Sequence, residues 1–315
     1  MDPQLTVTAE AEPVPANTRI EIVSERLEGP VGGTLTDPVA VRITDSTGVA
    51  LADVPVSWTA AGGGTIAVIE SRTDSLGRST GRWTLGPASG VQRAFAQVGN
   101  PRLLPRVTLT ARALAGDPAT ATLGGSAKPQ GAVGKPLKPV PAVQVRDRWG
   151  NPLAGSRVVL RPAAGSVVDT VVITDSAGRA SVPWTLGRAA GTQKLAARVE
   201  GISQPVELTA SARPLPGANL GFVSLPASSA AGRALAKPVE VELTDPYGNP
   251  VADQPILFAT KQGTLAPARV MTDARGRART RWTLGAKPGD QTLAAAVSGT
   301  RVRTSGTVRA VAPRR

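Results

Sequence analysis

Four arginines at every second position are the residues of this chain best suited to binding an anion. They are Arg275, Arg277, Arg279 and Arg281. Alternate side chains of a β-strand point to the same face, so at least the last three would form a row of guanidinium groups. Guanidinium groups donate paired hydrogen bonds to phosphate or sulfate. The row predicts either a polyanion-binding surface or a solvated outer face that discourages aggregation.

The residue types needed for most catalytic or metal chemistry are missing. The chain has no cysteine and no histidine, which excludes thiolate nucleophiles, histidine general bases and zinc sites of the Cys/His type. Its recurrent aspartates fall in turns, where an aspartate accepts hydrogen bonds from its own backbone, and no loop has the acid density of a calcium site. These turn aspartates are Asp45, Asp74, Asp147, Asp175, Asp245 and Asp273. We therefore expect no enzyme activity, no metal and no cofactor.

The positive charge increases along the chain. The net charge is +13, yet residues 1–113 hold 10 Lys and Arg against 11 Asp and Glu, and residues 214–315 hold 14 against 6. A basic surface attracts polyanions with salt-sensitive strength. Anionic polysaccharide or lipid head groups are therefore candidate partners, whereas nucleic acid is disfavoured because no aromatic platform is expected beside the arginines.

A threefold internal repeat organises the sequence. The string Trp-Thr-Leu-Gly occurs three times at a period of about 100 residues. Each copy follows Thr-Asp-x-x-Gly-Arg and precedes Gly-x-Gln. The repeated tryptophans are Trp83, Trp184 and Trp282. Several anchors in one order at one period predict three copies of a single domain.

Within each repeat the apolar residues alternate, which is typical of β-strands. Val39, Val41 and Ile43 alternate in the first repeat, and Val182 and Trp184 belong to such a set in the second. The size of the repeat and its frequent turns suit an immunoglobulin-like sandwich, in which we expect the repeated tryptophan to anchor the core. The sequence therefore predicts an all-β protein of three tandem immunoglobulin-like β-sandwich domains in a rod-like array.

The repeat also resembles a known family. The run TDSAGRASVPWTLG followed by GTQKLAARVEG, and preceded by VQVRDRWGNPLAGSRVVL, is similar to bacterial Ig-like domains of the invasin/intimin type. The resemblance covers nearly the whole chain, three times over. It implies modules that act chiefly as spacers. The sequence shows neither the lectin-like tip nor the membrane-anchoring barrel of that family, so no adhesive site carries over.

The repeat sets the expected domain limits and leaves one strand over. We expect Ig-like domains at residues 13–113, 114–213 and 214–315, and a surplus strand within residues 1–12 that resembles the last strand of a preceding repeat. This strand comprises Leu5, Thr6, Val7, Thr8, Ala9, Glu10 and Ala11. It represents either an arbitrary cut through a longer array or a strand that pairs with a sheet edge of another chain.

The predicted links between domains are short and contain proline, which makes them semi-rigid. Trp149 and Tyr247 stand at equivalent turn positions, each before Gly-Asn-Pro. They are expected either to pack at a domain junction or to contact a ligand. Strands of this length give domains of roughly 30–40 Å and a rod on the order of 100 Å.

The function predicted from these features is a non-catalytic spacer, an adhesin-like stalk of a bacterial extracellular or cell-surface protein. Its expected partners are the neighbouring Ig-like domains. One alternative is a self-assembling fibre or virion subunit that binds other copies of itself through the N-terminal strand. Another is a module whose basic third domain binds an anionic glycan or lipid. The sequence contains no apolar run long enough for a transmembrane helix and no export signal.

Overall fold

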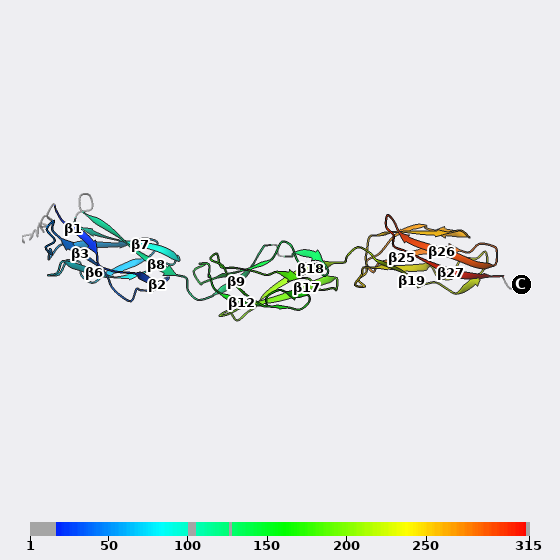
Figure 1. Ribbon diagram of the computed structural model, residues 1–315, viewed down its shortest axis with the longest axis horizontal. Coiled ribbons are helices and arrows are strands. Elements are labelled where there is room, and N and C mark those ends of the chain that lie inside the picture. Colours follow the sequence, from blue (N-terminus) through cyan, green and yellow to red (C-terminus); the bar gives the residue numbers. More distant parts are fainter. Residues whose placement is uncertain (1–16, 100–104, 126–127, 313–315) are drawn as a thin grey trace, which may run out of the picture.

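Three β-sandwiches follow one another along the long axis of the molecule (Figure 1). The computed structural model describes residues 17–99, 105–125 and 128–312, and every regular element among them is a β-strand. Each sandwich has its own cluster of buried apolar side chains. We call them domains 1, 2 and 3 in chain order. The predicted all-β class is confirmed, whereas the surplus strand at residues 5–11 lies outside the described residues.

Domain 1 shows the arrangement of strands that all three domains share. One sheet has the order β1-β3-β6-β5 and the other the order β2-β8-β7-β4. Strand β2 runs parallel to β8, and the other pairings are antiparallel. The strands are β1 (Arg19–Ile22), β2 (Leu27–Pro30), β3 (Val39–Thr44), β4 (Val56–Ala60), β5 (Thr65–Val68), β6 (Arg78–Thr84), β7 (Gly90–Val98) and β8 (Arg106–Leu114).

Domain 2 repeats this pattern with one interruption. The strand that carries Trp184 is divided into β15 and β16 by Pro183, because proline has no N–H for a sheet ladder. The larger sheet has the order β10-β18-β17-β12-β14. The strands are β9 (Thr120–Gly124), β10 (Gln130–Ala132), β11 (Ala142–Arg146), β12 (Arg157–Pro162), β13 (Ser166–Val167), β14 (Val171–Ile173), β15 (Arg179–Ser181), β16 (Trp184–Thr185), β17 (Gly191–Val199) and β18 (Val206–Arg213).

Domain 3 has sheets of order β19-β21-β25-β23 and β20-β27-β26-β22-β24. Its tryptophan strand, β25, is continuous. The strands are β19 (Asn219–Ser224), β20 (Ser228–Ala230), β21 (Val239–Thr244), β22 (Pro255–Thr260), β23 (Thr264–Ala266), β24 (Arg269–Met271), β25 (Arg277–Thr283), β26 (Gly289–Val297) and β27 (Arg303–Val311). No helix long and apolar enough to cross a membrane is found in the described part of the chain.

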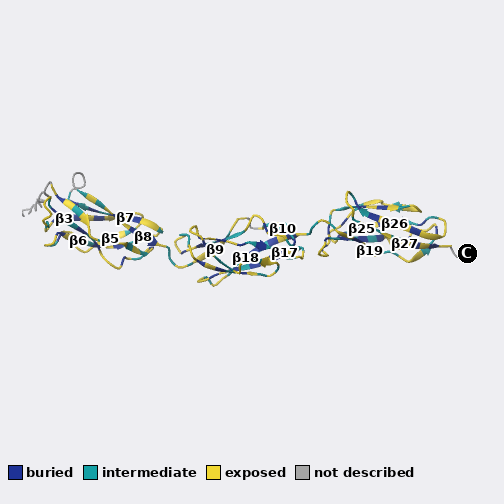
Figure 2. Ribbon diagram, in the orientation of Figure 1, coloured by how far each residue is buried: buried dark blue, intermediate teal, exposed yellow. Residues whose placement is uncertain are grey.

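The repeated tryptophan lies at the centre of each core. Buried residues line the interior of every sandwich (Figure 2). Relative exposure is at most 1% for Trp83, Trp184 and Trp282. The last two donate their indole N–H to the carbonyl oxygens of Ala164 at 2.9 Å and Gln262 at 3.2 Å. In domain 1 the matching loop contains Gly62 and Gly63, both with positive φ, and the indole nitrogen has no acceptor among the described residues.

Domain 1 has a second core tryptophan that needs its own hydrogen-bond partner. The indole nitrogen of Trp58 donates to the hydroxyl oxygen of Ser79 at 3.0 Å, and that hydroxyl donates to the carbonyl oxygen of Glu70 at 2.7 Å. Ser79 is fully buried. The corresponding residues of domains 2 and 3 are Ala180 and Ala278, so an alanine fits this strand position. The serine of domain 1 therefore has a specific role, which is to accept the hydrogen bond of the Trp58 indole N–H.

We predict that Ser79→Ala destabilises domain 1 by about 1–3 kcal/mol, because the Trp58 indole N–H is then buried without an acceptor. Urea unfolding followed by tryptophan fluorescence measures the change. Thr59→Ala, on the exposed face of the strand that carries Trp58, is the control and should change stability much less. Equal midpoints for Ser79→Ala and the unsubstituted protein would contradict the prediction.

Candidate functional site

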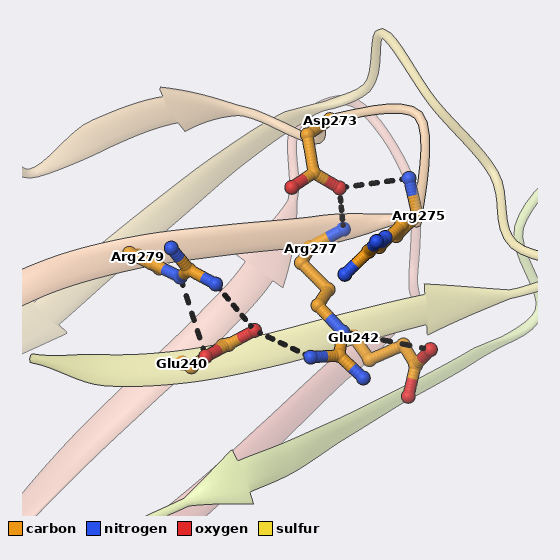
Figure 3. Close-up of polar contacts among 6 residues, drawn as sticks. All are labelled: Glu240, Glu242, Asp273, Arg275, Arg277 and Arg279. Carbon is orange, nitrogen blue, oxygen red and sulfur yellow. Dashed lines mark hydrogen bonds and ion pairs between the residues drawn. The ribbon is translucent and has the colours of Figure 1, made fainter.

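Two members of the arginine row, Arg277 and Arg279, lie beside Glu240 and Glu242 (Figure 3). Strand β25 pairs with β21 so that Arg277 is opposite Glu242 and Arg279 is opposite Glu240. The Glu240 carboxylate lies 3.1 Å from Arg277 Nη1 and 3.2 Å from Arg279 Nε. The Nε atom of Arg277 lies 4.0 Å from Glu242 Oε1. The two central arginines are therefore ion-paired within the sheet.

The ion pairs involve only two of the four arginines of the predicted row. Arg275 precedes β25, in the turn, and its side chain makes no hydrogen bond or ion pair with the described residues. The same is true of the Arg281 side chain, farther along β25. Two carboxylates thus offset the charge of Arg277 and Arg279, and this lowers the attraction of this face for anions. A polyanion site on these four residues stays a prediction.

The carboxylates of the turn aspartates accept hydrogen bonds from the backbone of their own turns. The carboxylate oxygen Oδ1 of Asp273 accepts the backbone N–H groups of Arg275 at 2.8 Å and Arg277 at 3.0 Å. These bonds, that of Arg277 first, hold the pKa of Asp273 below its usual value. Asp74 and Asp175 accept the same pair of bonds in their turns. Within the described residues no three Asp or Glu side chains come together as metal ligands.

A second kind of aspartate stabilises each domain junction. Asp147 is buried, with 2% of its surface exposed. Its Oδ1 accepts the backbone N–H groups of Trp149 and Asn151, both at 2.9 Å. Its Oδ2 accepts the side-chain amide of Asn151 at 2.9 Å and the backbone N–H of Gly116, in the link from domain 1, at 3.0 Å. One carboxylate therefore fixes both a turn and the interdomain link.

The junction between domains 2 and 3 has the same arrangement. Asp245, which is fully buried, accepts the backbone N–H groups of Tyr247 at 2.8 Å and Asn249 at 2.9 Å. It also accepts the Asn249 side-chain amide at 2.9 Å and the N–H of Leu215, in the link, at 3.1 Å.

The asparagine that each aspartate holds reaches the preceding domain. Asn151 Nδ2 donates to the Pro87 carbonyl at 2.7 Å, and its Oδ1 accepts the Ser89 N–H at 2.9 Å. Asn249 makes the matching bonds with the Arg188 carbonyl and the Ala190 N–H, both at 2.8 Å. We call this pair of bonds across a junction the asparagine clamp. The same clamp closes both junctions.

A glutamine shapes the loop that the clamp holds. Gln92 Oε1 accepts the Gly86 N–H at 2.7 Å, and its Nε2 donates to the carbonyls of Gly86 at 3.0 Å and Ala88 at 2.6 Å. Gln193 makes the same three bonds in domain 2. The repeated Gly-x-Gln therefore presents one carbonyl and one N–H to the next domain.

The junctions also contain an aromatic contact. Gly32 and Gly134 have φ of 68° and 67°. A Cβ on Gly32 would lie 2.8 Å from Trp149 Cζ2, and one on Gly134 would lie 3.0 Å from the Tyr247 hydroxyl oxygen. Both the backbone angle and the close approach therefore require glycine. Trp149 and Tyr247 thus pack against the preceding domain, as the junction interpretation expected.

The outer ends of the chain do not repeat the clamp. In domain 1, Thr47 and Val49 replace the aromatic residue and the asparagine. In domain 3, Pro288 replaces Ser89 and Ala190, so the N–H that the asparagine would bind is missing.

Sequence reasoning missed the roles of asparagine and glutamine at the junctions. The available signals were Gly-Asn-Pro, present twice, and Gly-x-Gln, present in every repeat.

Comparison with known proteins identifies the fold. Residues 222–311 match the family model of the bacterial Ig-like domain (group 1). The solved structure of FdeC, an adhesin of Escherichia coli, is similar with a TM-score of 0.61 at 17% identity, covering 95% of this chain and 99% of that one. InvD of Yersinia pseudotuberculosis is similar with a TM-score of 0.56 at 14% identity, covering 93% of this chain and 97% of that one. No curated protein matches the sequence.

These matches confirm two predictions, the immunoglobulin-like sandwich fold and the resemblance to bacterial Ig-like domains of the invasin/intimin type. At such low identities the two solved structures show the fold of this chain. They lend no support to the alternative of a virion subunit.

We predict that Asn151→Ala and Asn249→Ala loosen the junctions without unfolding the domains. Each substitution removes two cross-domain hydrogen bonds worth on the order of 1 kcal/mol each. Small-angle X-ray scattering should then show a broader distribution of molecular lengths. Val49→Ala, at the equivalent turn of domain 1, is the matched control and should leave the scattering unchanged. Unchanged scattering from a double asparagine variant would refute the clamp.

We also predict that acid weakens the junctions. Burial by itself raises the pKa of Asp147 and Asp245, but the hydrogen bonds, first among them those from Asn151 and Asn249, outweigh it and the net pKa is lowered. A lowered folded-state pKa gives stability that is present above the ordinary aspartate value and lost as the pH falls below about 4.

Scattering and thermal melting between pH 7 and pH 3 measure this effect. Asp147→Asn with Asp245→Asn should flatten the pH profile. Asp169→Asn removes an exposed carboxylate that has no hydrogen bond in the described residues, and it should retain the profile. An identical acid response in the double variant would contradict the assignment.

Proposed function

We propose that this chain is a non-catalytic spacer, a stiff segment of the stalk of a bacterial cell-surface, adhesin-like protein. The observation that carries the proposal is the asparagine clamp at both domain junctions. A stiff spacer needs a fixed angle between its domains, and domains of one chain move relative to one another unless their interface prevents it. Two buried carboxylates bond the links and two asparagines bond the preceding domains, and together they fix that angle.

Several contacts act together at each junction. The aspartate fixes the link, the asparagine bonds the preceding domain, and the aromatic ring packs on a glycine turn. Interfaces between domains of one chain often allow relative motion unless they are large or specifically bonded. Here the asparagine of the clamp bonds the preceding domain only when the two domains keep one relative placement, so bending a junction breaks these hydrogen bonds. Force or position at one end is thereby transmitted to the other.

The known relatives support the proposed location. FdeC is an adhesin, and its structure matches this chain over almost its whole length. We therefore place this protein outside the cell or on the bacterial surface. The proposed role requires no catalytic group, and the aspartates at the best-defined sites serve turns and junctions. The alternative of a self-assembling subunit rests on residues 5–11.

We predict a monomeric rod on the order of 100 Å long. Size-exclusion chromatography with light scattering and negative-stain imaging measure mass and length. A version lacking residues 1–12 should behave identically. Oligomers or fibres formed by the full chain alone would instead assign assembly to the N-terminal strand and overturn the spacer proposal.

The location is tested on cells of the source bacterium. An antibody against domain 2 should label intact cells, and external protease should remove that label. Labelling only after the cells are opened would exclude the surface role.

A further inference from the structure

The end of domain 3 remote from domain 2 is formed by three loops. They span residues 231–238, 261–263 and 284–288. The Leu284 N–H donates to the Arg233 carbonyl at 3.0 Å, and the Gly232 N–H donates to the Gly285 carbonyl at 3.0 Å. The Trp282 indole bonds the Gln262 carbonyl at 3.2 Å. These bonds gather the loops into one surface, which we call the end face of domain 3.

Each loop of the end face carries exposed cations. The four side chains make no hydrogen bond or ion pair within the described part of the chain, and all four residues are exposed. They are Arg233, Lys237, Lys261 and Lys287. Four unpaired cations on three adjoining loops give this end a positive potential that attracts anions.

The fold does not require these cations. The repeat aligns them, in order, with four residues of domain 1, namely Gly33, Asp37, Ala61 and Ala88. The corresponding residues of domain 2 are Lys135, Pro139, Ala163 and Ala189. The ends of domains 1 and 2 are the ones on which another domain packs. The equivalent loops of domain 2 also carry three cations, Lys135, Lys138 and Arg188, whereas those of domain 1 carry none, so the fold itself does not require positive charge there.

The loop of residues 284–288 in the end face has only part of the site that an asparagine bonds in the other domains. Gln291 still shapes the loop, since its Oε1 accepts the Gly285 N–H at 2.7 Å and its Nε2 donates to the carbonyls of Gly285 and Lys287 at 3.0 Å. Pro288, however, offers no N–H to an asparagine. The loop thus keeps the shape seen in domains 1 and 2 but lacks the N–H that bonds an asparagine there.

Few acids compensate the charge of this end. Asp290 begins strand β26 and lies opposite Arg309 in the sheet. Glu240 and Glu242 pair with the arginines of β25 instead. None of these three acids forms an ion pair with the four cations of the end face.

We propose that the end face of domain 3 binds an anionic polysaccharide through Arg233, Lys237, Lys261 and Lys287. Long, mobile cations on separate loops suit the sulfate, phosphate or carboxylate groups spaced along a flexible polymer. A lipid surface would favour apolar or aromatic side chains among the cations, and these three loops expose no large apolar residue. This site goes beyond the spacer role and does not depend on it.

The test measures binding of a fluorescent heparin oligosaccharide to the full chain by anisotropy at several salt concentrations. Replacing the four cations by glutamine should lower affinity on the order of tenfold or more near 0.1 M salt and reduce its salt dependence. The control removes equal charge from domain 2 through Lys128→Gln, Arg157→Gln, Arg161→Gln and Arg198→Gln. Those side chains are also exposed and unpaired in the described residues, and the control should retain most of the affinity.

Equal losses in the two quadruple variants would show a diffuse charge effect and overturn the site. Failure of the unsubstituted chain to bind heparin would overturn it as well. Binding to vesicles of anionic lipid but not to heparin would reject the polysaccharide assignment in favour of a membrane. Circular dichroism and scattering of the same samples report fold and rod length, so failure of this site is distinguishable from failure of the spacer role.

Discussion

A buried carboxylate at each domain junction is the group on which the extended structure depends. Asp147 and Asp245 are removed from water and retain their charge because backbone and side-chain N–H groups surround them. Those donors come from the turn, the link and the clamping asparagine, so the carboxylate is satisfied only when all three are in place. The folding of this turn in the following domain is thereby coupled to the placement of the preceding domain.

Each domain must be stable without a disulfide. Antibody domains connect their two sheets through a cystine beside a tryptophan, whereas this chain has no cysteine. Here the tryptophan strand is supported by close packing and by polar groups that tie loops to the core. The indoles of Trp184 and Trp282 donate hydrogen bonds to loop carbonyls. Gln92 and its equivalents bond the loop that follows the tryptophan strand. The loops that hold the core are also those that meet the next domain, so domain stability and junction geometry are coupled.

Charge is arranged differently at different places in domain 3. On the β21–β25 face, Arg277 and Arg279 are paired with Glu240 and Glu242, and the cross-strand pairing contributes to the sheet. At the end face the cations have no such partners. The number of arginines in a stretch is therefore a poor guide to anion binding, because the residues opposite them in the neighbouring strand decide how much charge remains available.

The sequence alone determined the fold class and the repeat, because alternation of Val39, Val41 and Ile43 and the recurrence of Trp83, Trp184 and Trp282 are local or periodic signals. It also indicated that Trp149 and Tyr247 occupy equivalent turns. The partners were decided only by the tertiary structure. Glu240 lies far from Arg277 in the chain, and Asn151 lies far from Pro87, so no spacing rule connects them. Strand register and domain docking bring these groups within bonding distance, since hydrogen bonds and ion pairs depend on separation in space.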